Sequence, residues 1–248
     1  MPSTAIRGLE ADRGALLEIC AGLTDADWKA DSGCAGWSVQ DVVAHLGALF
    51  WMVVDPSVLP DVSGLPTERA QDRLVAARRS LGPQQTMADY EEVSAEAIGR
   101  LAGLEAEDFE ISLEDFGTYE AWVLPNAYCF DHYTHIRADL FAPRGPLTGD
   151  PPPSDEQRLV PTVTWIAAAA PHQNAALLAT LTGSVEIVVH GPGSRTIKLG
   201  PGEPVARIAT DAPGLARWIT QRATWEDTGA QAAGDQRHLA AARKLKVF

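Results

Sequence analysis

Two residues near the middle of the chain have the spacing of a metal-ligand pair. Asp131 and His135 stand four positions apart in the stretch Asp131-His132-Tyr133-Thr134-His135. On an α-helix, positions i and i+4 share one face and lie about one turn apart. A carboxylate and an imidazole placed in this way could bind one divalent metal ion together, as the two histidines of H-E-x-x-H do.

A third ligand must come from elsewhere, and His45 is the best candidate. It stands in an apolar helical pattern that includes Val42, Val43 and Leu46. Three protein ligands leave one position open for water or substrate, which is typical of catalytic metal sites. Two alternatives stay open: His45 could be a buried structural histidine, and His132 could replace Asp131, because positions three apart also share a face.

The helices that must position these residues have clear start signals. Ser38, with Asp41 three residues later, predicts a capped helix that carries His45 and continues to about residue 54. Pro125 fits the first turn of a helix over 126–141, which presents Asp131 and His135. Further helices are expected over 4–23, 67–81 and 86–101, the last one capped by Thr86, whereas 111–122 reads as a loop or a short extended piece. Together these elements predict an up-and-down helical bundle.

The sequence changes character after a proline-rich stretch. Residues 143–158 form an expected linker, so the predicted domains are 1–142 and 159–248. The second domain should contain a helix over 163–181, strands over 184–190, 195–199 and 205–210, and a helix over 212–222. A polar tail is expected from Trp225. The fold class is therefore α+β, with two domains.

Composition narrows the class of protein. The chain has 248 residues and a formal net charge of -13, which disfavours nucleic acid and anionic lipid as partners. It shows neither a membrane-spanning apolar run nor the pattern of a signal peptide. The three cysteines, Cys20, Cys34 and Cys129, are scattered, which favours a reducing, cytoplasmic setting and predicts small packing roles for all three.

Two motifs resemble those of one family. The segment Gly36-Trp37-Ser38-Val39-Gln40-Asp41-Val42-Val43-Ala44-His45-Leu46 is similar to a signature of the mycothiol-dependent maleylpyruvate isomerase family. The second motif, an acidic residue four positions before a histidine and then an Asp-Leu pair, is matched by Asp131, His135 and Asp139-Leu140. A weaker match lies in Trp218–Arg222, at the end of the last predicted helix. The resemblance covers nearly the whole chain and implies a DinB-like four-helix bundle followed by a small α+β domain similar to sterol-carrier folds.

The resemblance also implies a site. The family's zinc ligands match His45, Asp131 and His135, and its catalytic arginine matches Arg222. Asp131 stands where the family usually has glutamate, and Gln221 stands where it usually has glycine. Mycothiol, a low-molecular-weight thiol, is the implied cosubstrate, and a small electrophile is the implied substrate.

The chemistry expected of such a site has two outcomes. A thiolate that adds to an unsaturated electrophile could allow cis-trans isomerisation, or it could end as S-transfer. The competing hypotheses are a metal-dependent hydrolase that needs no thiol and a non-catalytic protein that binds an apolar ligand. The sequence predicts a monomer or a small homo-oligomer.

Several other residues have two interpretations. Arg222 could instead stabilise a helix C-terminus through its charge. Asp139 could accept a hydrogen bond from a ligand imidazole or simply end its helix. The remaining residues of interest are expected to have structural or surface roles: Trp37, Trp51 and Trp122 in core packing, and His172, His190 and His238 at the surface.

Overall fold

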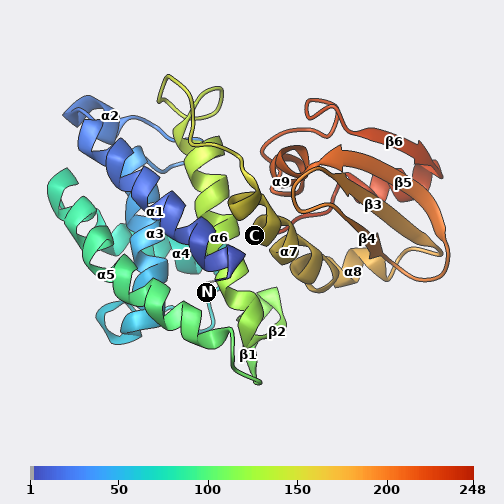
Figure 1. The fold of residues 1–248 in the computed structure, drawn as a ribbon, viewed down its shortest axis with the longest axis horizontal. Helices are drawn as coiled ribbons and strands as arrows, with labels where there is room; N and C mark the ends of the chain where they lie inside the picture. The colour runs from blue at the N-terminus through green and yellow to red at the C-terminus, as the bar shows by residue number, and fades with distance from the viewer. Residues whose placement is uncertain (1–2) are drawn as a thin grey trace.

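The molecule consists of a helical part and a sheet-containing part that lie side by side. A computed structural model describes residues 3–248, apart from the side chain of residue 115. Figure 1 shows the early helices on one side and the late strands on the other, with α7 between them. The expected α+β fold class is confirmed.

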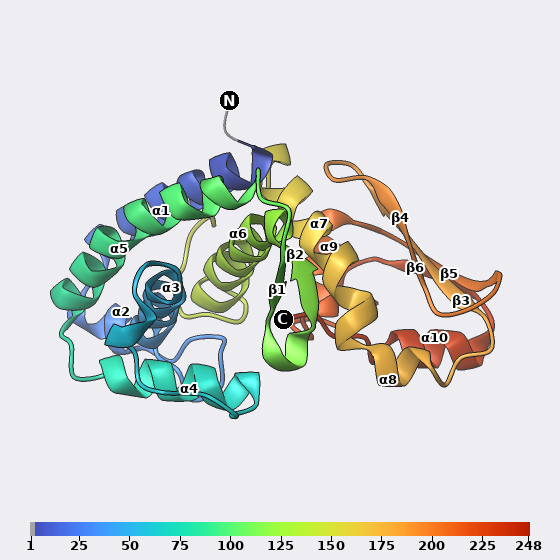
Figure 2. The ribbon, with the colours of Figure 1, turned by 90° about the horizontal axis from the view of Figure 1, so that it is seen from below.

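The helical part is built on long helices with a shared apolar core. Its helices are α1 (Thr4–Gly22), α2 (Asp25–Lys29), α3 (Val39–Val54), α4 (Thr67–Arg78), α5 (Pro83–Leu104) and α6 (Leu124–Thr134). Side chains of α1, α3 and α5 fill the core, among them Leu9, Leu16, Val42, Phe50 and Leu101. In Figure 2, α4 lies beside α3 at the edge of this group.

The expected start of α3 is confirmed in detail. Ser38 Oγ accepts a hydrogen bond from the Asp41 amide at 3.2 Å, and the Asp41 carboxylate accepts one from the Ser38 amide at 3.0 Å. This reciprocal capping box satisfies two amides that a helix start otherwise leaves without partners. It places His45 in the second turn of the helix.

The expected cap of the next long helix is wrong. We predicted that Thr86 begins it, but α5 begins at Pro83, after Gly82. A proline in the first turn has no amide to satisfy and its φ already fits a helix. The Gln85 side chain accepts a hydrogen bond from the Gly82 amide at 2.9 Å, and Thr86 lies buried inside the helix.

The segment around 111–122 forms a small hairpin before α6. Strands β1 (Glu110–Ser112) and β2 (Thr118–Glu120) pair antiparallel. Helix α6 then runs to Thr134 and continues as a π-helical turn over His135–Leu140. Such turns are rare and often lie at functional sites. The predicted helix over 126–141 is therefore present, but its last part is wider than an α-helix.

The sheet-containing part is a two-layer arrangement. Its elements are α7 (Glu156–Gln173), α8 (Ala175–Leu178), β3 (Ser184–His190), β4 (Arg195–Leu199), β5 (Pro204–Asp211), α9 (Ala212–Ile219), β6 (Gln231–Gly234) and α10 (Gln236–Ala242). The strand order is β4-β3-β5-β6, with β3 and β5 parallel. Val185, Ile187 and Ile208 project from one face into a core shared with α7, α9 and α10. On the other face, Arg207 and Glu186 form an ion pair at the surface.

Three sequence predictions for this part need correction. The helix expected over 163–181 begins at Glu156, because Asp155 caps it, and it ends at Gln173. The helix expected over 212–222 ends at Ile219. The tail from Trp225 is not merely polar, since it forms β6 and α10 and buries Trp225, Leu239 and Val247 in the core.

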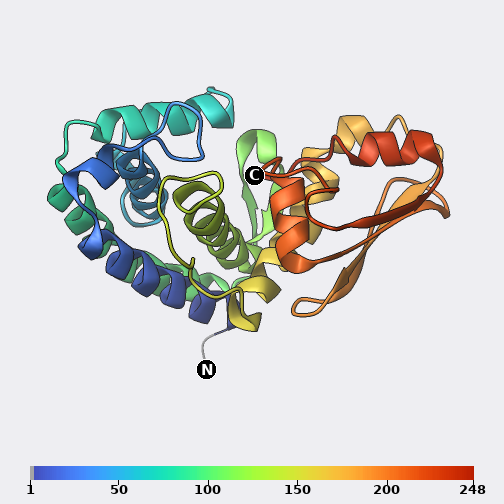
Figure 3. The same cartoon turned by 90° about the horizontal axis from the view of Figure 1, so that it is seen from above.

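Helix α6 and the turn that follows it link the two parts. Phe130 and Tyr133 belong to the core under the sheet, whereas Ile136 and Leu140 belong to the helical core. Figure 3 shows α6 next to the chain that leads into the second part. The division into 1–142, 143–158 and 159–248 stays a prediction.

A buried cluster of ion pairs stabilises the junction between the helical part and the sheet-containing part. Asp12 of α1 accepts hydrogen bonds from Arg137 Nη2 at 2.8 Å and from Arg158 Nε at 2.6 Å. These arginines belong to the π-helical turn and to α7, so one fully buried carboxylate holds three segments together. Within residues 3–248, no helix is long and apolar enough to cross a membrane.

Candidate metal centre

The three predicted metal ligands converge in the structure. His45 of α3 directs Nε2 to within 3.4 Å of Asp131 Oδ2, and His135 Nε2 lies 3.5 Å from Asp131 Oδ1. One potential ligand atom from each residue lies within 4.8 Å of the other two. Both imidazoles are buried, whereas the Asp131 side chain is 23% exposed. We refer to these three residues as the triad.

The spacing of the triad fits a small tetrahedral cation. Zinc bonds of about 2.0–2.1 Å separate tetrahedral ligand atoms by about 3.3–3.4 Å. The separations of 3.4 and 3.5 Å from the two histidine nitrogens to Asp131 are close to this value, each measured to a different carboxylate oxygen. Asp131 Oδ2 is also buried with no hydrogen-bond partner of ordinary geometry among the described residues. The shorter side chain of aspartate therefore reaches far enough to serve as a ligand here.

Charge and burial shift the pKa values of the triad in different directions. Burial opposes a charged His135, but the negative charge of Asp131 and hydrogen bonds to Asp131 and Asp139 outweigh it and raise the pKa of His135 well above its usual value. Burial lowers the pKa of His45, only partly opposed by Asp131. Burial would raise the pKa of Asp131, but the two histidines hold it well below its usual value. In the metal-free triad these shifts favour a proton on His135 beside an ionised Asp131.

Zinc binding should release this proton. The raised pKa of His135 favours a protonated Nε2, and a metal ion must displace that proton. His45 releases none, because its pKa is lowered and its imidazole is already neutral. We expect about one proton released per zinc, and an affinity that rises about tenfold per pH unit below the pKa of His135. Calorimetry in buffers of different ionisation enthalpy measures this; zinc uptake with no proton release would contradict it.

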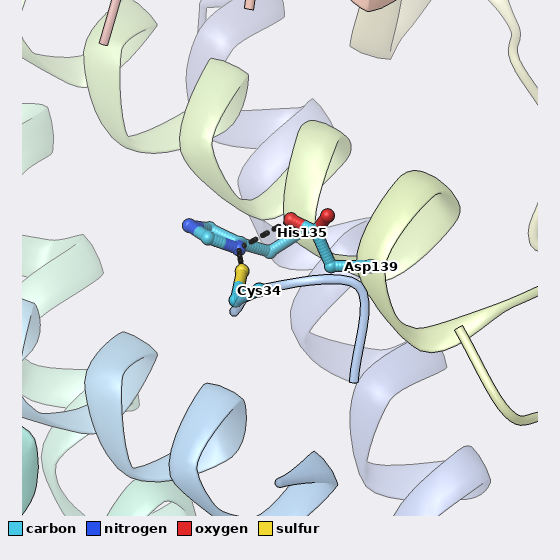
Figure 4. Close-up of side chains that lie close together, drawn as sticks. All are labelled: Cys34, His135 and Asp139. Atoms are coloured by element: carbon cyan, nitrogen blue, oxygen red, sulfur yellow. Dashed lines mark hydrogen bonds and ion pairs between the residues drawn. The ribbon is translucent and has the colours of Figure 1, made fainter. Parts of the chain in front are cut away.

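The second nitrogen of His135 has its own partners. Asp139 Oδ2 lies 2.9 Å from His135 Nδ1, and Cys34 Sγ lies 3.6 Å from the same nitrogen. Figure 4 shows both groups on this side of the ring. Of the two interpretations of Asp139, the structure confirms the hydrogen bond from the imidazole, which fixes the ring with Nε2 toward Asp131. Cys34, Asp139 and His135 are also close enough to hold a metal, but other cations already neutralise Asp139.

Cys34 is a residue that sequence reasoning missed. Its expected role was packing, but it lies in the loop between α2 and α3, directly before the Gly36-Trp37 motif. The loop approaches His135 closely because Gly33 has no side chain; a Cβ there would lie 2.8 Å from Asp139 Oδ1. The Gly33 amide also donates to the Asp139 carbonyl oxygen at 2.8 Å. The flanking glycines were the available signal.

Arg222 reaches the site from the other half of the molecule. It follows α9, and its Nε lies 3.0 and 2.9 Å from the two Asp139 carboxylate oxygens, while Nη2 lies 2.5 Å from Oδ2. The preceding residue, Gln221, has φ +58°, a left-handed conformation that glycine adopts more easily. Nη1 has no hydrogen-bond partner among residues 3–248. Arg222 therefore supports His135 through Asp139 and keeps one donor group free.

The other histidines considered in the sequence lie in different environments. His132 lies in the helical core, where its nitrogens contact the Tyr128 carbonyl oxygen at 2.9 Å and the Tyr90 hydroxyl at 3.1 Å, so it does not replace Asp131. His172 and His190 are exposed as expected. His238 is not at the surface; it is buried and accepts a hydrogen bond from the Gly183 amide at 3.2 Å.

The predicted core tryptophans differ in their positions. Trp122 is 48% exposed, so its expected packing role is wrong. Trp51 is partly buried and donates a hydrogen bond to Asp89. The Trp37 ring lies 5.0 Å from that of His45 and 6.4 Å from that of His135, between centroids. Trp37 thus forms an aromatic wall of the triad.

Comparison with known proteins places the chain in a family. The family model of the mycothiol maleylpyruvate isomerase N-terminal domain matches residues 9–141, more than half of the chain. The protein therefore belongs to this family, and the resemblance of its motifs is confirmed.

Two solved structures extend the similarity to the second part of the chain. They are a mycothiol-dependent maleylpyruvate isomerase and a histidine-to-alanine mutant of such an enzyme, each with a TM-score of 0.59 and 14% identity. Each alignment covers 93% of this chain and 92% of the other. At this identity the similarity concerns the fold. The search of curated proteins gives no match.

Proposed function

We propose that this protein is a zinc enzyme that uses a low-molecular-weight thiol, mycothiol, to act on a small electrophile. The observation that carries the proposal is the convergence of His45, Asp131 and His135 around one point, where the Asp131 side chain is partly exposed. Membership of the mycothiol maleylpyruvate isomerase family supports mycothiol as the thiol. The proposal extends to a DinB-like bundle, a sterol-carrier-like second domain and a cytoplasmic location, which three cysteines without disulfides favour.

The triad would hold the ion and leave one position for the thiol. When bound, the ion supplies a positive charge that lowers the pKa of a thiol at that position. His45 and His135 would bind through Nε2, and Asp131 through its carboxylate. Trp37, which lies against both imidazoles, would keep water from that side of the site.

The reaction proposed is reversible addition to a conjugated double bond. The thiolate sulfur bonds to one alkene carbon, and the electron pair of the double bond moves to the carbonyl oxygen as an enolate. Rotation about the resulting single bond, followed by loss of the thiolate, returns the electron pair and gives the trans isomer. If a different group leaves, the product is a stable S-conjugate. Both outcomes use the same site residues.

Arg222 is the proposed catalytic residue of this scheme. Its Nη1 has no partner in the described part of the chain, although its other nitrogens bind Asp139. A guanidinium donor in this position suits a substrate carboxylate or the developing enolate oxygen. Asp139 would set the direction of that donor.

The direct test compares reactions with and without thiol. We expect isomerisation of maleylpyruvate, or conjugation of a related electrophile, with mycothiol present, and loss of both on chelation of the metal. Metal-dependent turnover without any thiol would support the hydrolase hypothesis instead. The apolar pocket among Leu177, Leu181, Val185 and Leu245 does not support the hypothesis of a non-catalytic protein that binds an apolar ligand. This pocket has no room even for a water molecule.

Asp131→Glu should retain zinc, because glutamate is the usual family ligand at this position. We expect a zinc affinity equal to or above that of the wild type, whereas Asp131→Ala should lose most of the affinity. Competition with a chromophoric chelator measures both variants, and circular dichroism checks that they are folded. A folded Asp131→Glu protein without zinc would count against the proposed alignment of ligands.

A further inference from the structure

Two buried polar atoms, one in the triad and one on the neighbouring helix α4, have no hydrogen-bond partner. They are His45 Nδ1 and Gln71 Oε1, and the statement applies to residues 3–248. Buried polar atoms in folded proteins are almost always paired. One of these atoms can donate and the other can accept, so they are complementary.

The two side chains belong to α3 and α4, which pack against each other. Burial lowers the pKa of His45, and the Gln71 carboxamide is one of the groups that oppose this effect. The other nitrogen of His45, Nε2, faces Asp131 Oδ2 at 3.4 Å. The nitrogen of His45 that is left for a partner from α4 is therefore Nδ1. An amide oxygen there favours the tautomer that has its proton on Nδ1.

Helix α4 is anchored in this position by contacts with the start of α3. Asp72, the neighbour of Gln71, accepts a hydrogen bond from Trp37 Nε1 at 3.1 Å. Arg79 donates to both carboxylate oxygens of Asp41 at 3.1 and 3.2 Å and to the Gly36 carbonyl oxygen at 3.0 Å. These contacts hold α4 against the loop and helix that carry the metal-site motif.

We propose that Gln71 is a positioning residue of the metal centre: in the zinc-bound protein its Oε1 accepts a hydrogen bond from His45 Nδ1–H, which leaves Nε2 free for the ion. The inference rests on the proposed function, because it requires an ion on the triad. Histidines that bind metals usually donate their second N–H to such a partner, and loss of that partner weakens binding by about 10–100-fold. Asp139 does the same for His135, so each imidazole of the triad has its own support.

Zinc affinity of three variants tests this role. We expect Gln71→Ala to weaken zinc binding by about 10–100-fold, as for other partners of this kind. Gln71→Glu keeps an acceptor oxygen at the same distance along the side chain and should stay within about tenfold of the wild type. The matched control is Gln84→Ala, an exposed glutamine on α5, which should leave the affinity unchanged.

Nitrogen NMR of the His45 ring gives a readout that does not depend on activity. The zinc-loaded wild type should carry its ring proton on Nδ1, and Gln71→Glu should keep it there. If Gln71→Ala had wild-type zinc affinity and an unchanged ring spectrum, the inference about Gln71 would be wrong, and the proposed function would not be affected. A wild type that binds no zinc would overturn the proposed function as well, whereas zinc binding without thiol chemistry would overturn only the function.

Discussion

His45→Ala should leave the protein without bound zinc. The variant removes one of three ligands and the only one that α3 contributes, so the ion would be held by Asp131 and His135 alone. We expect zinc affinity to fall by much more than the roughly 10–100-fold that follows when a residue hydrogen-bonded to a metal ligand is removed. Elemental analysis of the purified protein, followed by competition with a chelator, measures the effect.

The matched control for this variant is His190→Ala. His190 lies exposed at the end of β3 and belongs to no candidate site. It should retain zinc as the wild type does. Equal zinc content in His45→Ala and the wild type would mean that the triad is not the metal site, whatever its geometry.

Arg222→Ala should abolish turnover and lower stability while zinc stays bound. Asp139 is fully buried, and Arg222 provides its closest charged contact, so the variant leaves a carboxylate with only His135 and a more distant Arg144 at 3.6 Å. Removal of one partner of a buried pair costs about 3–5 kcal/mol, and the remaining partners place the expected loss at the lower end. Denaturant unfolding and zinc analysis measure these two effects separately from activity.

Two further variants distinguish the catalytic role of Arg222 from its structural role. Arg222→Lys keeps the charge but loses the planar fork, so we expect partial recovery of stability and little recovery of turnover. Arg217→Ala, an exposed arginine of α9, should change neither. If Arg222→Ala turned over substrate at the wild-type rate, Arg222 would be a structural residue only.

The parts of the site whose geometry the sequence predicted depend on local rules. The capping box of Ser38 and Asp41 lies within four residues, and the shared face of Asp131 and His135 follows from helix geometry. His45 required a non-local step, which the family motif supplied. In these cases the local signal and the tertiary structure agree.

The parts that the sequence did not predict depend on the packing of distant segments. Asp139 meets Arg222 across 83 positions and Cys34 meets His135 across 101, and no periodic pattern encodes such contacts. Gln71, the proposed positioning residue, was also not singled out, although it lies one turn before buried Leu74 and Val75 on α4. Strand β6, with the sequence QAAG, has no β-branched residue and pairs only because β5 is beside it. The sequence offers two possible starts for α5, and the helix begins at Pro83, after Gly82, and not at Thr86.

The most direct test of the central claim is metal content of the purified protein, followed by titration of the loaded site with mycothiol. The proposed function predicts about one zinc per chain and thiol binding that disappears on chelation. A protein that takes up no metal even after reconstitution, or that binds mycothiol equally well without metal, would contradict it.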